Sequence, residues 1–292
     1  MAAGGPSDLS ARAMEKVSKK YLGQPLVIVN KAGAGGTLGY NEIVESKADG
    51  YTIGLAATNM LLQPLYGGTE YNYPEELLPI GQAVSNPVAI AVLADSGINN
   101  LDDLIKYTQQ NPGKLKYAYT NVGSLPHVVS GMFVSQTKVQ MEPVPFQGGS
   151  DSLTAFLGNN VQVIFTQVSE LKSHVKDGKV RMLAVATENR LPNFPDLPTF
   201  KENNLDIVAA TWFGICAPKD IPEEIKTKLT EGFKNIINDE SFKKTAEDLG
   251  FYVEYLSSDE MDEKWKKETE TFSKAVKDSG IGEQMAEQSG KN

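Results

Sequence analysis

The chain has 292 residues, 40% of them hydrophobic and 22% charged, which is the profile of a globular protein rather than a disordered or fibrous one, and at about 100 to 200 residues per domain this length favours two domains. Its 28 basic and 37 acidic residues leave a net charge of −9, which argues against a partner made of nucleic acid or anionic lipid. With one cysteine and two histidines, the chain can form neither an intramolecular disulfide nor a Cys/His zinc cage, and we predict no metal and no cofactor.

The first segments alternate between helical and strand patterns. A stripe of Leu9, Ala13, Val17 and Tyr21 predicts a helix that begins at Ser7 or Asp8 and ends at Gly23. The β-branched run at 26–30 predicts a strand, followed by a glycine turn, an amphipathic helix to about residue 47, and a second strand over 49–58.

The same alternation continues through the middle of the chain. Helices are predicted over 101–110, 124–137, 150–158 and 169–178, and strands over 115–120, 142–146, 161–165 and 180–187. After residue 218 come helices starting at Ile221 and Asp239, a strand over 251–256, and a charged helix over 258–279. Alternation of this kind indicates an α/β fold, in which mainly parallel sheets are flanked by helices.

Two apolar runs, 77–97 and 207–218, interrupt the alternation because no helix separates their halves. We interpret both as crossovers between two lobes. Lobe 1 is then discontinuous, with residues 1–96 and 217–292, and lobe 2 comprises 97–216. A cleft between the lobes is the expected ligand site.

Four glycine-rich turns each open a predicted helix, and they are the strongest chemical signal in the sequence. They lie at 3–8, 33–37, 121–124 and 147–151. A helix N-terminus exposes unpaired N–H groups, and glycine lets a ligand oxygen approach them closely. No turn contains Lys or Arg, so we expect an anion to be held by backbone N–H groups and hydroxyls. In the alternative interpretation, these residues only form tight turns and cap helices.

Other chemistries fit the spacing poorly. The segment at 33–39 lacks the third glycine of G-x-G-x-x-G, and the chain has no P-loop. Ser124 and His127 are three residues apart and could form a nucleophile and base, although no G-x-S-x-G motif surrounds the serine. Tyr117 and Tyr119 either line a pocket or pack in a core, because strand alternation leaves both open.

Segments along nearly the whole chain resemble the solute-binding proteins of tripartite tricarboxylate transporters, also called the Bug family. They are GGPSDLSAR at 4–12, LGQPLVIVNKAGAGGTLG at 22–39, ADGYTIGLAAT at 48–58, NVGSLPH at 121–127, VPFQGGSDSLTAFLGNNVQVIF at 144–165, LPNFPDLPTFKE at 191–202 and TWFGICAPKDIP at 211–222. The resemblance implies a two-lobed, type II periplasmic-binding (Venus flytrap) fold without enzymatic activity. Such a receptor captures a small carboxylate and delivers it to a membrane permease.

The resemblance also implies a set of ligand-binding residues. Lobe 1 would supply Gly5, Ser7, Asp8, Thr58 and Asn59, and lobe 2 would supply Asn121, Gly123, Ser124, His127, Gly148, Thr166 and Gln167. The expected ligand is a mono- or dicarboxylate, or an amino acid, in preference to citrate. Two alternatives remain at this point: a two-lobed hydrolase that uses Ser124 and His127, and a ligand-sensing effector domain.

The resemblance further implies an extracytoplasmic, monomeric receptor whose partners are the permease subunits and no nucleic acid. In the family, a strand precedes the first glycine turn, whereas only Met1–Ala3 precede it here. We therefore expect this chain to lack both that strand and the export signal.

Overall fold

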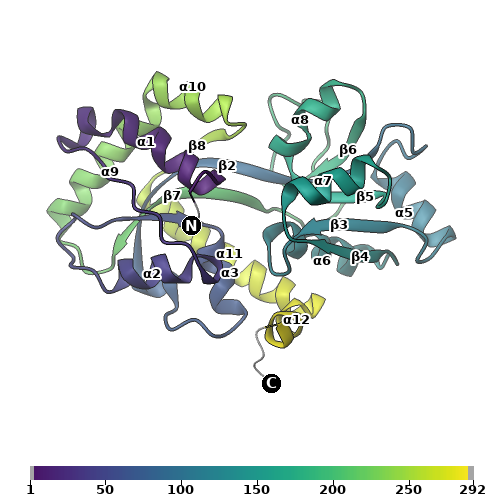
Figure 1. The fold of residues 1–292 in the computed structure, drawn as a ribbon, viewed down its shortest axis with the longest axis horizontal. Coiled ribbons are helices and arrows are strands. Elements are labelled where there is room, and N and C mark those ends of the chain that lie inside the picture. The colour runs from purple at the N-terminus through teal and green to yellow at the C-terminus, as the bar shows by residue number, and fades with distance from the viewer. Residues whose placement is uncertain (1–2, 289–292) are drawn as a thin grey trace. The chain divides into compact units, whose positions relative to one another are not determined.

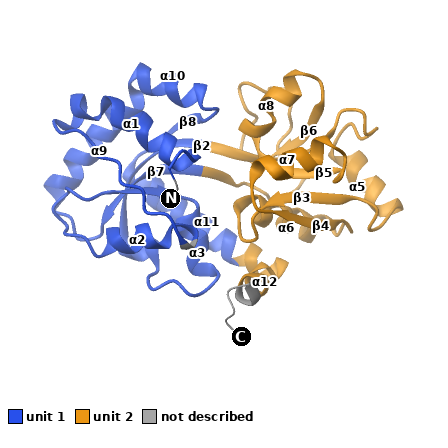
Figure 2. Ribbon diagram, in the orientation of Figure 1, with its two compact units in different colours: residues 1–85, 212–273 blue, residues 86–211, 274–292 orange. Residues whose placement is uncertain are grey.

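The computed structural model describes residues 3–288 and is shown in Figure 1. The chain divides into two compact units: unit 1 comprises Met1–Ser85 and Trp212–Ser273, and unit 2 comprises Asn86–Thr211 and Lys274–Asn292 (Figure 2). It passes from one unit to the other inside β2 (Leu77–Leu93), β7 (Ala210–Pro218) and α11 (Ser258–Ser279).

These passages differ from the expected lobe boundaries after residues 96 and 216, because the units divide within the two strands rather than at their ends. A continuous apolar strand shows no change of composition where its neighbours change. The passage through α11 was not predicted: it assigns residues 274–292 to unit 2, whereas the sequence placed them in lobe 1.

Unit 1 has antiparallel strand pairs and a helical layer. Its further elements are α1 (Pro6–Leu22), η1 (Ala34–Gly36), α2 (Thr37–Val44), β1 (Gly54–Ala57), α3 (Asn59–Leu65), α4 (Tyr73–Glu76), α9 (Glu223–Asn238), α10 (Glu240–Asp248) and β8 (Tyr252–Leu256). β1 pairs with β7, and β2 pairs with β8. Helix α1 packs against α9 and α10, and the core between them includes Met14, Phe233 and Ile236.

Three expectations for unit 1 are wrong. Its strand pairs named above are antiparallel rather than parallel. Residues 26–30 form no strand, because they have no strand partner, and Val27 and Val29 are 80% and 68% exposed. Leu9, a member of the predicted apolar stripe, is exposed, and the buried face of α1 includes Ala13 and Met14 instead. The expected short N-terminal stretch, Met1–Ala3, lies in part outside the described residues.

Unit 2 follows the predicted alternation closely. Its elements are α5 (Leu101–Gln110), β3 (Lys116–Thr120), α6 (Leu125–Thr137), β4 (Glu142–Phe146), α7 (Gly149–Leu157), β5 (Val163–Gln167), α8 (Val168–Lys176), β6 (Val180–Val185), η2 (Lys201–Asn203) and α12 (Ile281–Gln288). β3 pairs in parallel with β4 and β5, whereas β2 is antiparallel to β5 and β6. Helices α6 and α7 pack on β3 and β5.

Within residues 3–288, no helix combines the length and the apolar character that a bilayer crossing requires.

Candidate functional site

Three of the expected ligand-binding segments meet at one edge of the unit 2 sheet. β4, β3 and β5 are neighbours and run in parallel, so their carboxyl ends share that edge. Asn121–Ser124 follows β3, Gly148 follows β4, and Thr166 and Gln167 end β5. The backbone N–H of Asn121 donates to the carbonyl of Phe146 over 2.7 Å, which ties the first turn to the end of β4.

The turn that opens α6 uses most of its own donors. Ser124 is the N-cap, and its hydroxyl accepts from the backbone N–H of His127 at 3.3 Å while donating to the carbonyl of Thr120. The N–H of Gly123 donates to Nδ1 of His127 at 3.1 Å, and Pro126 has no N–H. Few backbone donors of this turn therefore remain for a ligand.

The turn that opens α7 is the more available anion site. Its N-cap, Gly148, has an extended backbone (φ −153°) and supplies no side-chain cap. Within the described part of the chain, the N–H groups of Gly149 and Ser150 have no hydrogen-bond partner. Unpaired N–H groups at a helix N-terminus, flanked by glycine, suit a carboxylate oxygen.

Glu170 of α8 approaches this turn and is a residue that the motif comparison missed. A Cβ atom on Gly149 would lie 2.5 Å from Oε1 of Glu170, so a larger residue at position 149 would displace the carboxyl group from this position. The Thr166 hydroxyl donates to the other carboxyl oxygen. Burial raises the pKa of Glu170, which favours the neutral acid beside the helix terminus. Glu170 follows Thr166 by four residues across the junction of β5 and α8, and this spacing is the sequence signal that could have identified it.

In unit 1, the Asp8 carboxylate is held by the protein itself. It accepts from the N–H of Gly4 (2.9 Å), from Nε of Arg12 (3.0 Å) and from Nδ2 of Asn30 (2.9 Å). These hydrogen bonds, that of Arg12 first, lower its pKa to about 2. Arg12 was also missed, although its spacing of four residues from Asp8 on a helix signals the pair.

The remaining expected residues of unit 1 lie at the start of two helices. Gly5 is the N-cap of α1, and Ser7, together with Asp8, lines a groove of about 570 Å³ whose other walls are formed by residues 24–31 and 51–55. Thr58 and Asn59 follow β1, and the buried Thr58 hydroxyl accepts from the backbone N–H of Trp212 at 3.0 Å.

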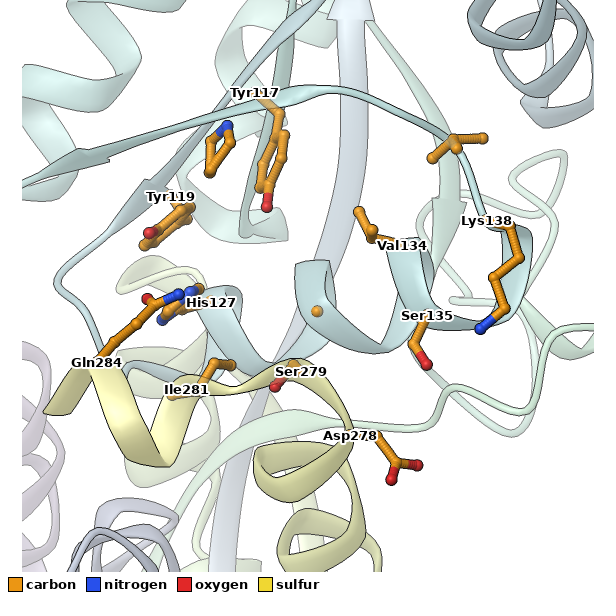
Figure 3. Close-up of a pocket in the computed structure, with 13 residues that line it drawn as sticks. Tyr117, Tyr119, His127, Val134, Ser135, Lys138, Asp278, Ser279, Ile281 and Gln284 are labelled. Carbon is orange, nitrogen blue, oxygen red and sulfur yellow. The ribbon is translucent and has the colours of Figure 1, made fainter. Parts of the chain in front are cut away.

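His127 faces a cavity of about 410 Å³ within unit 2 (Figure 3). Its ring stacks on Tyr119, with centroids 4.0 Å apart and planes within 1°. Burial lowers the pKa of His127 to about 4, so the ring is neutral at pH 7. Nδ1 of His127 accepts from Gly123 and the Ser124 hydroxyl donates to the carbonyl of Thr120, so the two side chains do not form a nucleophile–base pair.

Comparison with solved structures places the molecule among the bacterial solute-binding proteins, not among enzymes. A TctC solute-binding protein from Polaromonas superposes with a TM-score of 0.88 at 28% identity, covering 94% of this chain and 95% of the other. MatC from Rhodopseudomonas palustris with bound malate gives a TM-score of 0.75 at 25% identity, covering 94% and 96%. A second R. palustris protein, with adipate, gives 0.78 at 25% identity, covering 96% and 95%.

Residues 10–280 match the model of the tripartite tricarboxylate transporter family receptor, TctC. The chain belongs to this receptor family. Protein BugT of Bordetella pertussis is 30% identical over 226 residues, which are 76% of this chain and 69% of BugT. These comparisons do not support the hydrolase alternative, and they confirm the expected α/β solute-binding fold.

Proposed function

We propose that this protein captures a small mono- or dicarboxylate outside the cytoplasm and delivers it to the permease subunits of a tripartite tricarboxylate transporter. Membership of the receptor family supports the delivery step. The malate and adipate in two structural relatives support a small carboxylate as the ligand. The receptor acts as a monomer in the periplasm or anchored at the cell surface.

In this proposal, one ligand carboxylate binds at the carboxyl edge of the unit 2 sheet. The N–H groups of Gly149 and Ser150 receive it, with Gly148 providing the space for close approach. Asn121, Gly123, Ser124, Thr166 and Gln167 surround this position, and His127 acts through the Gly123 turn. In unit 1, the proposal assigns ligand binding to the α1 turn, at Gly5, Ser7 and Asp8, and to Thr58 and Asn59. The unpaired N–H groups at α7 carry this proposal.

Gly148→Ala tests it most directly. A Cβ atom on Gly148 would meet only Oδ2 of Asp151, at 3.9 Å, and its φ of −153° suits any residue, so the fold should be unaffected. The methyl group would nevertheless obstruct a ligand oxygen at the helix terminus. We expect malate or adipate binding, measured by calorimetry, to weaken about tenfold or more while the melting temperature stays constant.

Gly282→Ala is the matched control, because that glycine lies in α12, outside the lining of both cavities described above, and its Cβ would make only one contact, at 3.4 Å to Cγ1 of Val276. It should bind the same ligands with unchanged affinity. Equal dissociation constants for Gly148→Ala and the parent chain would remove the α7 turn from the site. A thermal-shift screen of mono-, di- and tricarboxylates and amino acids identifies the ligand, since ligands that bind the native state raise its stability.

A further inference from the structure

The cavity that His127 faces is lined by aromatic, apolar and polar side chains of unit 2. Tyr117, Tyr119 and His127 lie at one end, and Ser135 and Lys138 at the other, with Ser279 and Ile281 of the C-terminal helices along the side (Figure 3). Its volume of about 410 Å³ falls within the range of small-molecule pockets.

Two accessible donors on the wall of this cavity make no hydrogen bond to the part of the chain that the structure describes. Tyr119 is 3% and His127 is 4% exposed, yet neither the Tyr119 hydroxyl nor Nε2 of His127 bonds to any described residue, and both atoms retain accessible surface. Both donors can therefore be reached by a molecule that enters the cavity.

The hydrogen bond at Nδ1 of His127 determines which ring nitrogen carries the proton. Nδ1 accepts the N–H of Gly123 at 3.1 Å and therefore carries no proton. The neutral ring keeps its proton on Nε2, which makes that atom a donor. Tyr119 adds a hydroxyl donor, and the stacked pair of rings presents both donors from a rigid surface.

The walls define what such donors would hold. Val139, Pro143 and Ile281 supply apolar surface, and Tyr117 adds a ring. Among the described lining residues the sole carboxylate is Asp278, which is exposed, while Lys138 adds a cation and the amide oxygen of Gln284 is a further acceptor. The matching molecule has a ring-sized body that packs on these apolar side chains, and it carries an oxygen acceptor for the two donors.

We infer that this cavity is a second ligand site, separate from the helix-opening turns, for a ring-sized molecule bearing a carbonyl or carboxylate oxygen that Tyr119 and His127 hydrogen-bond. The inference does not depend on the proposed transport ligand, because the cavity belongs to unit 2 alone and lies along α6 rather than at the α7 terminus.

Benzamide and benzoate are suitable probes, and benzylamine is the negative probe because it offers a donor where an acceptor is needed. Calorimetry should show saturable binding of benzamide, of benzoate, or of both, and none of benzylamine. If only benzamide binds, the site takes neutral carbonyl compounds; if benzoate binds, it takes aromatic carboxylates. Binding of neither, or binding of benzylamine with equal affinity, would overturn the inference.

Tyr119→Phe removes one hydroxyl and keeps the ring, so binding should weaken about two- to tenfold, the loss of one hydrogen bond. Tyr107→Phe, at an exposed tyrosine of α5, is the matched control and should have no effect. Val134→Phe fills the cavity from α6 and should abolish binding, with the melting temperature reported alongside. Unchanged binding in Tyr119→Phe would place the probe elsewhere.

Two further measurements separate this site from the transport site. Since the chain has only two histidines, nitrogen NMR, assigned with His127→Gln, can show the Nε2–H form of His127 and its shift on probe binding. Saturating malate or adipate should leave probe affinity unchanged. Full competition would mean a single site and would overturn the inference, whereas failure of malate and adipate to bind would affect only the proposed function.

Discussion

Glu268 of α11 is the residue whose titration should most affect stability. It lies within unit 1, where Nε1 of Trp212 donates to it at 2.7 Å and Nζ of Lys264 is 3.8 Å away. Burial raises its pKa to about 7 from 4.5, although Lys264 and the Trp212 hydrogen bond act against this shift. Glu254 raises and Lys267 lowers the pKa by smaller amounts.

The sign of the pH dependence follows from this shift. Between pH 4.5 and about 7 the folded chain holds the proton and the unfolded chain releases it, so the free energy of unfolding falls as pH rises through that window. A shift of this size corresponds to about 3 kcal/mol. Glu268→Gln keeps an acceptor for Trp212 and cannot titrate, so it should lack this decline and be the more stable chain above pH 7.

Urea unfolding followed by tryptophan fluorescence from pH 5 to 8 measures the difference. Glu263→Gln, at an exposed position of the same helix, should follow the parent curve. Parallel curves for Glu268→Gln and the parent would show that Glu268 is ionised in the folded chain.

Glu170 should make ligand binding depend on pH. If a ligand carboxylate binds at the α7 turn, ionised Glu170 repels it and neutral Glu170 does not, so affinity should fall as pH rises through the pKa of this group. Glu170→Gln should bind malate several-fold more tightly at pH 8 and show little pH dependence. Calorimetry from pH 5 to 8 checks this, with the exposed Glu283→Gln as control. A pH dependence that survives in Glu170→Gln would assign it to another group.

At the scale of single elements, two glycines should respond to alanine in opposite directions. In α9, a Cβ on Gly232 would lie 2.3 Å from Cδ2 of Leu22, so overpacking of about 1–3 kcal/mol should outweigh a helix-propensity gain of about 1 kcal/mol. In α2, Gly39 has the space and should gain up to about 1 kcal/mol. In thermal unfolding, Gly232→Ala should therefore melt below the parent chain and Gly39→Ala above it. A raised melting temperature for Gly232→Ala would mean that Leu22 moves aside freely.

The groove of unit 1 should accept an additional strand. β1 pairs with β7, and the extended residues 26–30, with exposed Val27 and Val29, form the facing wall. Fusing about eight alternating apolar residues ahead of Gly4 should raise the melting temperature, because Ser7 and Asp8, where the chain enters α1, also line the groove. A glycine–serine extension of equal length is the control. Equal melting temperatures would show that the groove does not bind a strand.

The sequence predicted most elements because helix and strand periods, caps and glycine turns are local properties. Asn100 and Ser124, for example, cap α5 and α6 as their spacing indicates. The predicted strand at 26–30 is wrong because a strand needs a pairing partner, and the local sequence pattern does not show whether one is present. For the candidate site, the glycine motifs located the helix-opening turns. Which of their N–H groups remain free for a ligand depends on tertiary hydrogen bonds, such as that from Gly123 to His127, and the local sequence does not show these bonds.

For the whole molecule, the net charge of −9 and the lack of basic residues in the four helix-opening turns should govern how ligand affinity depends on salt. The nearest guanidinium, of Arg12, is engaged by Asp8. Short-range N–H donors are poorly screened, while salt weakens the long-range repulsion of an anion over a Debye length of about 10 Å at 0.1 M. Affinity for malate or adipate should stay constant or rise slightly from low to moderate sodium chloride. A steep loss with salt, measured by calorimetry, would indicate a cation in the site.

The three passages of the chain between the units also set the order in which the protein can fold as it is synthesised. Residues 86–211 emerge as one uninterrupted piece and contain every strand of unit 2. The first 85 residues, in contrast, must wait for β7, α9 and β8 before their sheet and core are complete. A nascent chain therefore exposes the apolar face of α1 while the later unit is already folding, and this early segment is where chaperone binding and premature aggregation would concentrate.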